Sequence, residues 1–494
     1  MQDVADLGLI IESNVPIIVL ETHDEQRALE LLTRVAIKKS LGFHCWSITE
    51  GLNRVGFGED LSPSEEPESP STVLKAIKRS GAPSIYALCD FHPFFAGNPE
   101  HIRLLKDVAL NYERLQHTVV LISHELDIPA EIHHHCAKFT MTLPSDVQLM
   151  SIVREEVAEW AKENTNARVK TDQLTFKKLI KNLRGLSRQD ARRLARGAIR
   201  DDGAITEADL PEVNRAKFEL IDMGGVLSFE YDTARFSAVG GLDRLKHWVK
   251  QREAIFLNAE GQSVDRPKGL MLLGIQGGGK SLAAKSVAGL WGVPLLRLDM
   301  AALYNKYIGE TEKNLNKALQ QSELMSPCVL WIDEIEKGLA TSDSDDGTSR
   351  RILGTLLTWM AERRANVFIV ATANDVTQLP PELMRKGRMD EIFFVDLPKL
   401  PVREEIFSIH LRKRNFDPEK FDLMSLAEQS EGFSGAEIEQ AVVAALYTAS
   451  AQKQPLATAL ISEQIANTYP LSIVMAEKVG QLKAWAAGRT VSAD

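Results

Sequence analysis

The chain has 494 residues, of which 44% are apolar, 26% charged and 6% aromatic. This length exceeds what a single hydrophobic core supports, so we expect roughly two to four compact units. The formal net charge is −10, from 68 acidic and 58 basic residues. This balance disfavours a protein that coats nucleic acid, because phosphate backbones require clustered Lys and Arg.

Cysteine usage and the amino-terminal residues predict a cytoplasmic protein. The four cysteines are scattered and form no C-x-x-C pair, which is typical of small buried side chains in a reducing compartment. Residues 1–25 carry acids where a secretory signal would be basic. The apolar run at 15–20 is too short to cross a bilayer. We therefore expect no membrane segment.

The first half predicts strands that alternate with helices. An acidic, Pro- and Ser-rich loop is expected at 58–72, and residues 146–200 have a helical period. The alternation indicates a mostly parallel sheet with helices on both faces. The expected strands are 17–20, 43–48, 84–91, 118–123 and 138–143, and the expected helices are 24–39, 73–80 and 99–115.

The same order recurs after an expected connector at about 201–235. Asp90 ends the run IYALCD and Asp333 ends VLWID, and two further segment pairs repeat at nearly the same offset. These are IPAEI with LPPEL, and GLSRQDARRLARGAI with GFSGAEIEQAVVAAL. Three matches in order predict an internal duplication. The second set of strands is expected at 270–273, 294–298, 328–333, 367–372 and 391–396.

Residues 274–281, GIQGGGKS, fit the phosphate-loop pattern G-x-x-x-x-G-K-[ST] after a strand. Glycines let backbone N–H groups face a β-phosphate, the Lys280 amine reaches the β/γ oxygens, and the Ser281 hydroxyl can bind Mg²⁺. A glycine-rich turn without a ligand is the alternative, which the flanking strand and helix disfavour. The residues expected to contact ATP are Gly274, Gln276, Gly277, Gly278, Gly279, Lys280, Ser281 and Leu282.

Polar residues also follow two later strands. We expect Asp333 to support the Mg²⁺ ion indirectly and Glu334 to polarise the attacking water, because adjacent carboxylates repel each other unless they serve a charged site. Asn374 would orient that water. Arg385 and Arg388 are either ordinary surface charges or groups that enter a neighbouring subunit's site.

From about 236 to 450 the chain resembles the AAA module of the AAA+ ATPase superfamily. The similar segments include FSAVGGLDRLK, YNKYIGETEKNL and GFSGAEI. The resemblance implies that Val239 and Gly240 lie near the base, and that Gly435 and Ala436 lie beside the nucleotide. It also implies ATP hydrolysis in a ring, usually hexameric, with the two arginines acting on the neighbouring subunit.

The phosphate loop departs from the family's usual GPPGTGKT at Gln276, Gly278 and Ser281. Every phosphate ligand survives these changes. The three successive glycines nevertheless predict a more flexible empty loop, and hence weaker nucleotide binding than in a proline-braced loop.

The segment Lys306, Tyr307, Ile308 and Gly309 resembles the first pore loop of the family. In rings of this family such side chains grip an unfolded polypeptide. The alternative is that Tyr307 packs against the following helix.

The first half lacks the parts of a phosphate site. The turn after the strand at 17–20 reads ETHDEQRA, which has acids and no glycine, and Phe91 stands where the second half has Glu334. We expect a degenerate, non-catalytic module. Residues 133–136 (HHHC) are adjacent in sequence and cannot converge on one metal ion, so a solvated turn is favoured.

A basic stripe recurs every four residues along one predicted helix. It indicates a solvated face or a contact with an acidic neighbour more than a nucleic-acid site, since no aromatic residues interleave it. Its members are Arg188, Arg192, Arg196 and Arg200.

Over essentially its full length the chain resembles AAA proteins first described as hypothetical reading frames of algal chloroplast genomes and found in cyanobacteria and other bacteria. A plastid stroma location applies only to the algal relatives. The expected fold is α/β, a P-loop AAA module with a small helical lid, preceded by a degenerate AAA-like module. The expected domains are 1–145 (degenerate), 146–225 (helical, with connector), 226–398 (catalytic) and 399–494 (lid and tail).

The hypothesis is therefore Mg²⁺-dependent ATP hydrolysis in a homo-oligomer that remodels or regulates an unidentified protein client. An ATP-gated scaffold that pulls nothing is the main alternative. A nucleic-acid motor is disfavoured by the net acidity.

Overall fold

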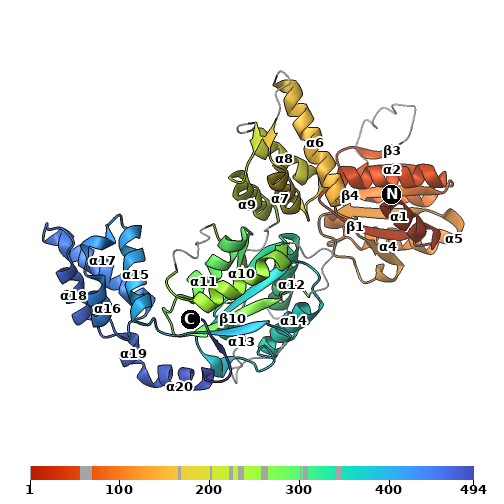
Figure 1. Cartoon of the computed structure of the whole chain (residues 1–494). Coiled ribbons are helices and arrows are strands. Elements are labelled where there is room, and N and C mark those ends of the chain that lie inside the picture. Colours follow the sequence, from red (N-terminus) through yellow and green to blue (C-terminus); the bar gives the residue numbers. More distant parts are fainter. Residues whose placement is uncertain are drawn as a thin grey trace. The chain divides into compact units, whose positions relative to one another are not determined.

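The structure is a computed structural model, and it forms two compact units (Figure 1). Unit 1 comprises Met1–Val153 and Leu186–Arg193, and unit 2 comprises Arg154–Gly185 and Leu194–Asp494. The structure describes residues 2–55, 69–164, 169–200, 203–221, 226–231, 239–257, 265–300, 302–303, 310–339, 347–385 and 387–494.

Unit 1 is built on a sheet of six described strands in the order β3-β2-β4-β5-β1-β6. All pairs are parallel except β2 with β3. Each of the five predicted strands has a counterpart, although the last lies at 136–139 and not at 138–143, whereas β3 was not predicted. The strands are β1 Ile17–Glu21, β2 Gly42–Ser47, β3 Gly51–Arg54, β4 Ser84–Cys89, β5 Thr118–Ser123 and β6 Cys136–Phe139.

Helices cover both faces of this sheet, as the alternating pattern predicts. One apolar cluster joins α1 and α2 to the sheet, and a second joins α3 and α4 to it. The helix predicted at 99–115 is divided at Asn111, and α1 was not predicted. The helices are α1 Gln2–Glu12, α2 Glu25–Lys39, α3 Pro70–Arg79, α4 Pro99–Leu110 and α5 Tyr112–Leu115, with short 3-10 turns η1 His92–Phe94 and η2 His133–His135.

The predicted connector at 201–235 is wrong, because it contains the helix α9 and two short strands. Leu210, Val213 and Phe218 give α9 a buried face. The helices of this region are α6 Asp146–Glu163, α7 Gln173–Leu183, α8 Arg188–Arg200 and α9 Asp209–Ile221, and β7 Lys170–Thr171 pairs with β8 Ala204–Ile205.

Two arginines of the basic stripe pair with carboxylates of α6. The Arg196 guanidinium lies 2.7 Å from Glu156 and 3.0 Å from Glu159, and the Arg200 guanidinium lies 3.1 Å from Glu163. At these two positions the acidic neighbour is therefore part of the same chain.

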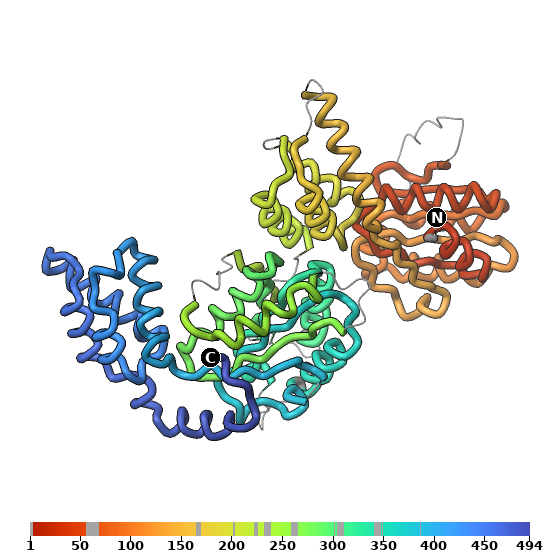
Figure 2. Tube along the Cα trace, in the orientation of Figure 1, coloured from red at the N-terminus to blue at the C-terminus, as the bar shows by residue number. Residues whose placement is uncertain are grey.

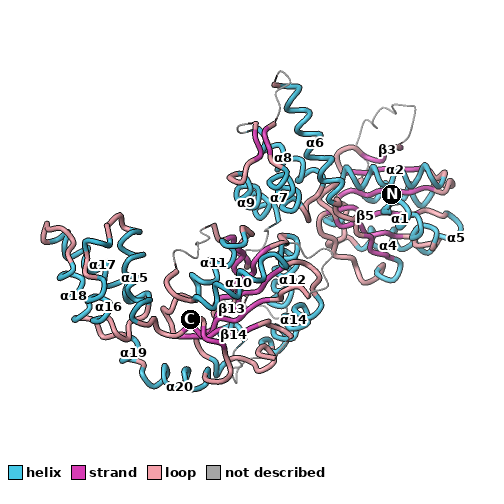
Figure 3. Tube along the Cα trace, in the orientation of Figure 1, coloured by secondary structure: helices cyan, strands magenta, loops and turns pink. Residues whose placement is uncertain are grey.

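Unit 2 contains a sheet of seven described strands in the order β15-β14-β10-β13-β12-β11-β9 (Figure 3). The five predicted strands are present, whereas β9 and β15 were not predicted. The strands are β9 Leu227–Phe229, β10 Gly269–Gly274, β11 Leu295–Asp299, β12 Cys328–Asp333, β13 Val367–Ala373, β14 Glu391–Val395 and β15 Val491–Ser492.

Both sheets place their five main parallel strands in the same spatial order. In chain order these are the fifth, first, fourth, third and second strands, which are β6-β1-β5-β4-β2 in unit 1 and β14-β10-β13-β12-β11 in unit 2. The agreement of two independent sheets fits the internal duplication inferred from the sequence.

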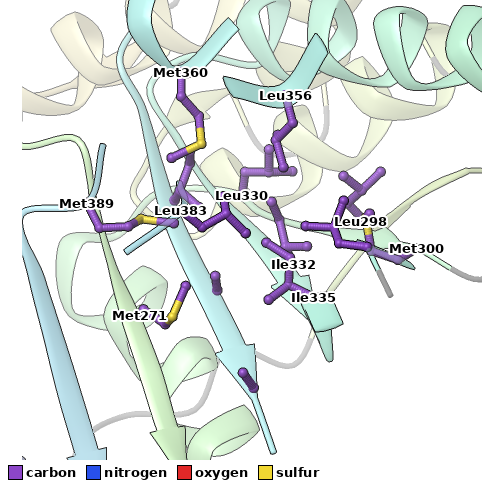
Figure 4. Close-up of a cluster of buried hydrophobic side chains, with 14 of the residues drawn as sticks. Met271, Leu298, Met300, Leu330, Ile332, Ile335, Leu356, Met360, Leu383 and Met389 are labelled. Carbon is purple, nitrogen blue, oxygen red and sulfur yellow. The ribbon is translucent and has the colours of Figure 1, made fainter. Parts of the chain in front are cut away.

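A methionine-rich core fixes the strand that carries Asp333 (Figure 4). Leu330 and Ile332 of β12, together with Ile335, are fully buried in a cluster that also contains residues of α14. Since buried residues lie on both sides of the acidic pair, the pair is held at the sheet edge by packing. The helices of this domain are α10 Asp243–Leu257, α11 Lys280–Trp291, α12 Glu310–Leu324, α13 Ile335–Leu339 and α14 Thr348–Glu362, with the 3-10 turn η4 Val376–Gln378.

A helical lid follows β14 and has its own apolar core. Its helices are α15 Leu400–Lys413, α16 Leu423–Gln429, α17 Gly435–Ala451 and α18 Thr458–Ala466, with the 3-10 turn η5 Pro418–Lys420. Helices α19 Leu471–Val474 and α20 Ala476–Ala486 then lead to β15, which pairs with β14. Figure 2 shows this dark-blue end of the chain beside the strands of the large domain. No helix in the described ranges is long and apolar enough to cross a membrane.

Lys217 of α9 is a buried amine that destabilises the fold at neutral pH. Its side chain is 1% exposed, its Nζ donates to the Arg184 carbonyl oxygen, and burial lowers its pKa from 10.5 to about 7. Below pH 7 the folded chain carries the full cost of the buried charge, and this cost fades as the pH rises from 7 towards 10.5.

We therefore expect Lys217→Met to raise the thermal unfolding midpoint at pH 7. The gain is roughly 3–5 kcal/mol before the lost hydrogen bond is subtracted. The advantage over the unmodified chain shrinks between pH 7 and pH 10, which thermal melts at a series of pH values will show. Lys177→Met, at an exposed position of α7, is the control and leaves the midpoint unchanged. A Lys217→Met variant that melts earlier at every pH contradicts the prediction.

Candidate functional site

The loop from Gly274 to Gly279 joins a buried central strand to the start of α11. Gly277 and Gly279 have φ of 76° and 94°, the left-handed region that glycine adopts without strain. A side chain at Gly277 would also approach the Ser434 hydroxyl to 2.9 Å. Gly278 is limited by space and not by its backbone angle, because a Cβ added there would lie 3.0 Å from the Ile275 carbonyl oxygen. Two of the three glycines are thus needed for the turn itself.

Lys280 is the first residue of α11 and its side chain lies inside the loop. It is 6% exposed, and its Nζ donates to the carbonyl oxygens of Gly274 (2.8 Å) and Ile275 (2.7 Å). Burial lowers the pKa of this amine to about 8, against the opposing attraction of Glu336, Asp333 and Glu334. The amine is therefore a cation held by two neutral acceptors, which an anion can displace.

Both oxygens of Asp333 have partners. Oδ1 accepts a 2.6 Å hydrogen bond from the Thr372 hydroxyl, and Oδ2 lies 3.0 Å from the Arg297 guanidinium. Sequence reasoning missed Thr372 and Arg297, because both come from neighbouring strands rather than from the motif itself.

Glu334 lies beside Asn374, as the sequence predicts for two residues at adjacent strand ends. The Asn374 side-chain amide donates to Glu334 Oε1 at 2.9 Å, and Lys337 pairs with Oε2. Glu334 has a left-handed backbone with φ 48°, which costs a non-glycine residue about 1–2 kcal/mol. Its N–H donates to the Thr372 hydroxyl at 3.0 Å, so that hydroxyl ties the two acidic residues together.

Glu336 is a third carboxylate that sequence reasoning missed. It is 3% exposed, and its Oε1 accepts the backbone N–H of Asn374 at 2.9 Å. Its Oε2 has no hydrogen-bond partner among the described residues, and burial raises its pKa. The run IDEIE contains this third carboxylate and was the available signal.

The glycine loop, Lys280, the acidic pair Asp333–Glu334, Thr372 and Asn374 line one cavity of about 420 Å³. Of the residues predicted to bind nucleotide or metal, only Gly274 is not in its lining; it accepts a hydrogen bond from Lys280 instead. The cavity is lined by Val239, Gly240, Gln276, Gly277, Gly278, Gly279, Lys280, Ser281, Leu282, Asp333, Glu334, Thr372, Asn374, Ile406, Ile409, His410, Gly435, Ala436 and Glu439.

The lid contributes four lining residues that the sequence analysis did not identify. Ile406, Ile409 and His410 come from α15, and Glu439 comes from α17. Burial lowers the pKa of His410, whose Nδ1 lies 3.4 Å from Glu439 Oε1. Arg414 pairs with the same oxygen at 2.9 Å. The lid therefore adds the polar side chains of His410 and Glu439 beside the apolar side chains of Ile406 and Ile409.

The two arginines predicted to act on a neighbouring subunit fall outside this cavity. Arg385 and Arg388 do not line it; Arg385 is exposed, and Arg388 Nη1 is buried without a hydrogen-bond partner among the described residues. Lys306, Tyr307, Ile308 and Gly309 lie outside the part of the chain that the structure describes.

Unit 1 keeps an acidic strand end without a phosphate loop. Asp90 has φ 50° and accepts a 2.9 Å hydrogen bond from the Ser123 hydroxyl, as Asp333 does from Thr372. In place of a glycine loop, Asp24 caps α2 by accepting the Arg27 N–H. Across the described residues, no group of three or more His, Cys, Asp and Glu is arranged to hold a metal ion.

Three family models match the chain. Residues 270–397 match the "ATPase family associated with various cellular activities (AAA)". Residues 3–141 match the "SpoVK-like AAA ATPase, N-terminal domain" and residues 147–224 match the "SpoVK-like AAA ATPase, second domain".

Full-length relatives also resemble the chain. The uncharacterized AAA domain-containing protein ycf46 of Trieres chinensis is 34% identical over 98% of this chain and 96% of the relative. The protein of the same description from Guillardia theta is 34% identical over 99% and 95%. The proteasome-activating nucleotidase of Aeropyrum pernix is 36% identical over 43% of this chain and 54% of its own length.

Proposed function

Because the chain belongs to the AAA family of ATPases, we propose that it binds ATP in the 420 Å³ cavity and hydrolyses it to ADP and phosphate. One observation carries the proposal. A glycine loop with a buried lysine and a Glu334–Asn374 pair line the same cavity. The volume lies within the range of small-molecule sites, about 300–1,000 Å³.

The phosphates would lie against the first turn of α11. The N–H groups of a helix's first turn lack helical partners and carry the positive end of the dipole, which favours an anion. Lys280 would exchange its two carbonyl partners for charged phosphate oxygens, which are stronger acceptors. With a pKa of about 8, the amine is mostly protonated at neutral pH and ready for this exchange.

The donor set fits Mg²⁺. The Ser281 hydroxyl and the Asp333 carboxylate line the same cavity, and Mg²⁺ prefers such oxygen ligands together with substrate phosphates. A bound ion would neutralise charge on the β- and γ-oxygens. Thr372 and Arg297 would hold the Asp333 carboxylate in a fixed orientation while Ser281 approaches from the helix.

Glu334 would act as the base. Its carboxylate would accept a proton from the water whose oxygen attacks the γ-phosphorus. The bond between that phosphorus and the oxygen bridging to the β-phosphate would then break, which releases ADP and phosphate. Asn374 would hold both the carboxylate and the water, because its amide already donates to Glu334. The Glu336 carboxylate would hold Asn374 in place by accepting the backbone N–H of Asn374.

Arg385 and Arg388 would complete the site of a neighbouring subunit in a homo-oligomer, which we propose to be hexameric. Their absence from the lining of their own cavity supports this assignment. Arginines supplied by another subunit stabilise the charge that develops on the transferred phosphate.

We propose that hydrolysis remodels or regulates a protein partner. Relatives over part of the chain include a proteasome-activating nucleotidase and a cell division cycle protein 48 homolog. Unit 1 has an AAA-like sheet without a glycine loop, which suits partner binding more than catalysis. We propose domains at 1–145, 146–225, 226–398 and 399–494; the family-model matches at 3–141, 147–224 and 270–397 each fall within one of the first three.

Lys280→Ala tests the proposed function. We expect at least a tenfold loss of ATP affinity and loss of turnover, because the variant removes the cation that faces the β- and γ-oxygens. Titration of a fluorescent ATP analogue and a phosphate-release assay, each with and without Mg²⁺, provide the measurements. Lys285→Ala, one turn further along α11, is the control. Equal ATP binding by the Lys280→Ala variant and the unmodified chain would overturn the proposal.

A further inference from the structure

The loop from Val239 to Leu242 forms a part of the cavity wall that is separate from the glycine loop in the sequence. Val239 and Gly240 line the cavity itself. The next two residues both have left-handed backbones, with φ of 65° at Gly241 and 59° at Leu242. Leucine is disfavoured there by about 1–2 kcal/mol, so neighbouring contacts must hold the loop in this shape.

Two carboxylates from distant segments accept hydrogen bonds from consecutive backbone N–H groups of this loop. The Gly241 N–H donates to Glu405 Oε2 at 2.9 Å, and the Leu242 N–H donates to Asp494 Oδ1. Glu405 belongs to α15 of the lid, whereas Asp494 follows β15. Hydrogen bonds from a backbone N–H to a carboxylate are among the stronger ones in proteins.

Close packing leaves this loop little room to rearrange. A side chain at Gly240 would approach Ile406 Cγ1 to 2.9 Å, and one at Gly241 would approach Asp494 Oδ1 to 2.8 Å. Ile406 also lines the cavity. The loop is thus enclosed by the lid on one side and by the residues after β15 on the other.

The segment that carries Asp494 is itself anchored to the large domain. β15 pairs with β14, the Ala493 N–H donates to the Phe394 carbonyl oxygen at 3.0 Å, and the Leu245 N–H donates to the Ala493 carbonyl oxygen at 3.2 Å. Ala493 is 1% exposed and shares an apolar cluster with Val239 and Leu242. Asp494 therefore has a fixed base from which to hold the loop.

We propose that Asp494 and Glu405 are positioning residues for the nucleoside of ATP, an inference that rests on the proposed function. They fix the 239–242 loop so that Val239 and Gly240 face the nucleoside. Because one carboxylate comes from the lid, a movement of α15 changes this wall directly. Because Asp494 follows the strand β15, the affinity for the nucleoside depends on a segment that does not line the cavity.

The test compares ATP with tripolyphosphate, which presents the three phosphates without a nucleoside. Asp494→Ala removes the acceptor, whereas Asp494→Asn keeps one oxygen acceptor and loses the charge. We expect the Kd for ATP to rise about tenfold in Asp494→Ala and by less in Asp494→Asn, while the Kd for tripolyphosphate stays within about twofold. At saturating ATP, kcat stays near that of the unmodified chain while KM rises.

Three further variants complete the design. Glu405→Ala and Glu405→Gln repeat the comparison from the lid side, and they decide the question if Asp494→Ala does not fold. Ser492→Ala, at an exposed side chain of β15, is the control and leaves both Kd values unchanged.

The outcomes separate this inference from the proposed function. An unchanged Kd for ATP in the folded Asp494→Ala and Glu405→Ala variants overturns the inference, and so does an equal loss of ATP and tripolyphosphate. If the unmodified chain binds no ATP, the proposed function is wrong and this inference loses its premise. A nucleoside-dependent loss in either variant, smaller in its amide counterpart, supports the inference.

Discussion

Glu334→Gln is expected to lower ATP turnover by about 10²- to 10⁴-fold while ATP still binds. Glutamine cannot take the proton of the attacking water, but it keeps the size of the side chain and an oxygen that can accept from the Asn374 amide. The glycine loop and Lys280 are untouched, so the affinity for ATP should remain. Phosphate release under single-turnover conditions, together with equilibrium binding of ATP, measures both quantities.

Glu477→Gln provides the matched control, because Glu477 is exposed on α20 and does not line the cavity. It should leave turnover unchanged. Turnover within about threefold of the unmodified chain in Glu334→Gln would exclude Glu334 as the base.

The same variant separates the two classes of mechanism that the sequence left open. A remodelling machine should retain its protein client in the ATP-bound Glu334→Gln form, because release requires hydrolysis. An ATP-gated scaffold should keep working, because ATP binding alone suffices. The lack of a glycine loop in unit 1 is compatible with both, since a partner-binding module needs no nucleotide of its own.

The double variant Arg385→Ala with Arg388→Ala is expected to lower turnover by about 10³-fold, with little change in the affinity for ATP. Neither arginine lines the cavity of its own chain, and in the proposed oligomer both act in a neighbour's site. Turnover per subunit should also rise with protein concentration in the unmodified chain, as subunits assemble. Phosphate release over a dilution series measures this dependence.

Arg412→Ala serves as the control for removal of a positive charge, because Arg412 is exposed on α15. It should assemble and turn over normally. Unaltered turnover in the double variant would mean that the two arginines are ordinary surface charges.

The sequence predicted the framework of the site because that framework is local. The strand, glycine loop and helix at 269–291 follow one another, and the acidic pair directly follows the buried run of β12. The internal duplication was predicted from three pairs of matching segments in the same order at a nearly constant offset. Strands β9 and β15 were missed because they span three and two residues, too short to show a period.

The partners of the motif residues could not be predicted because they are tertiary contacts. Thr372 reaches Asp333 across a strand pair, and Asp494 reaches Leu242 over a separation of 252 residues. No pattern within a window of sequence records such contacts. Glu336 is different, because the third acid of IDEIE was visible, but its support of Asn374 depends on where β13 ends.

The structure also shows energetically unfavourable features at the site that the sequence does not show. Lys280 is buried with a pKa lowered to about 8, Glu334 has a left-handed backbone, and Glu336 has an oxygen without a partner among the described residues. A triphosphate would supply charged partners for the lysine. Such unfavourable features at one cavity fit a site prepared for a ligand.

We propose that one subunit holds ATP and that arginines of the next subunit complete its hydrolysis. Mixing two inactive proteins tests it most directly: the Arg385→Ala, Arg388→Ala double variant, which has an intact cavity, and Glu334→Gln, which has intact arginines. We expect turnover to return on mixing, at sites where the double variant binds ATP and Glu334→Gln subunits supply the arginines. Co-assembled mixtures that stay as inactive as the separate proteins would contradict it.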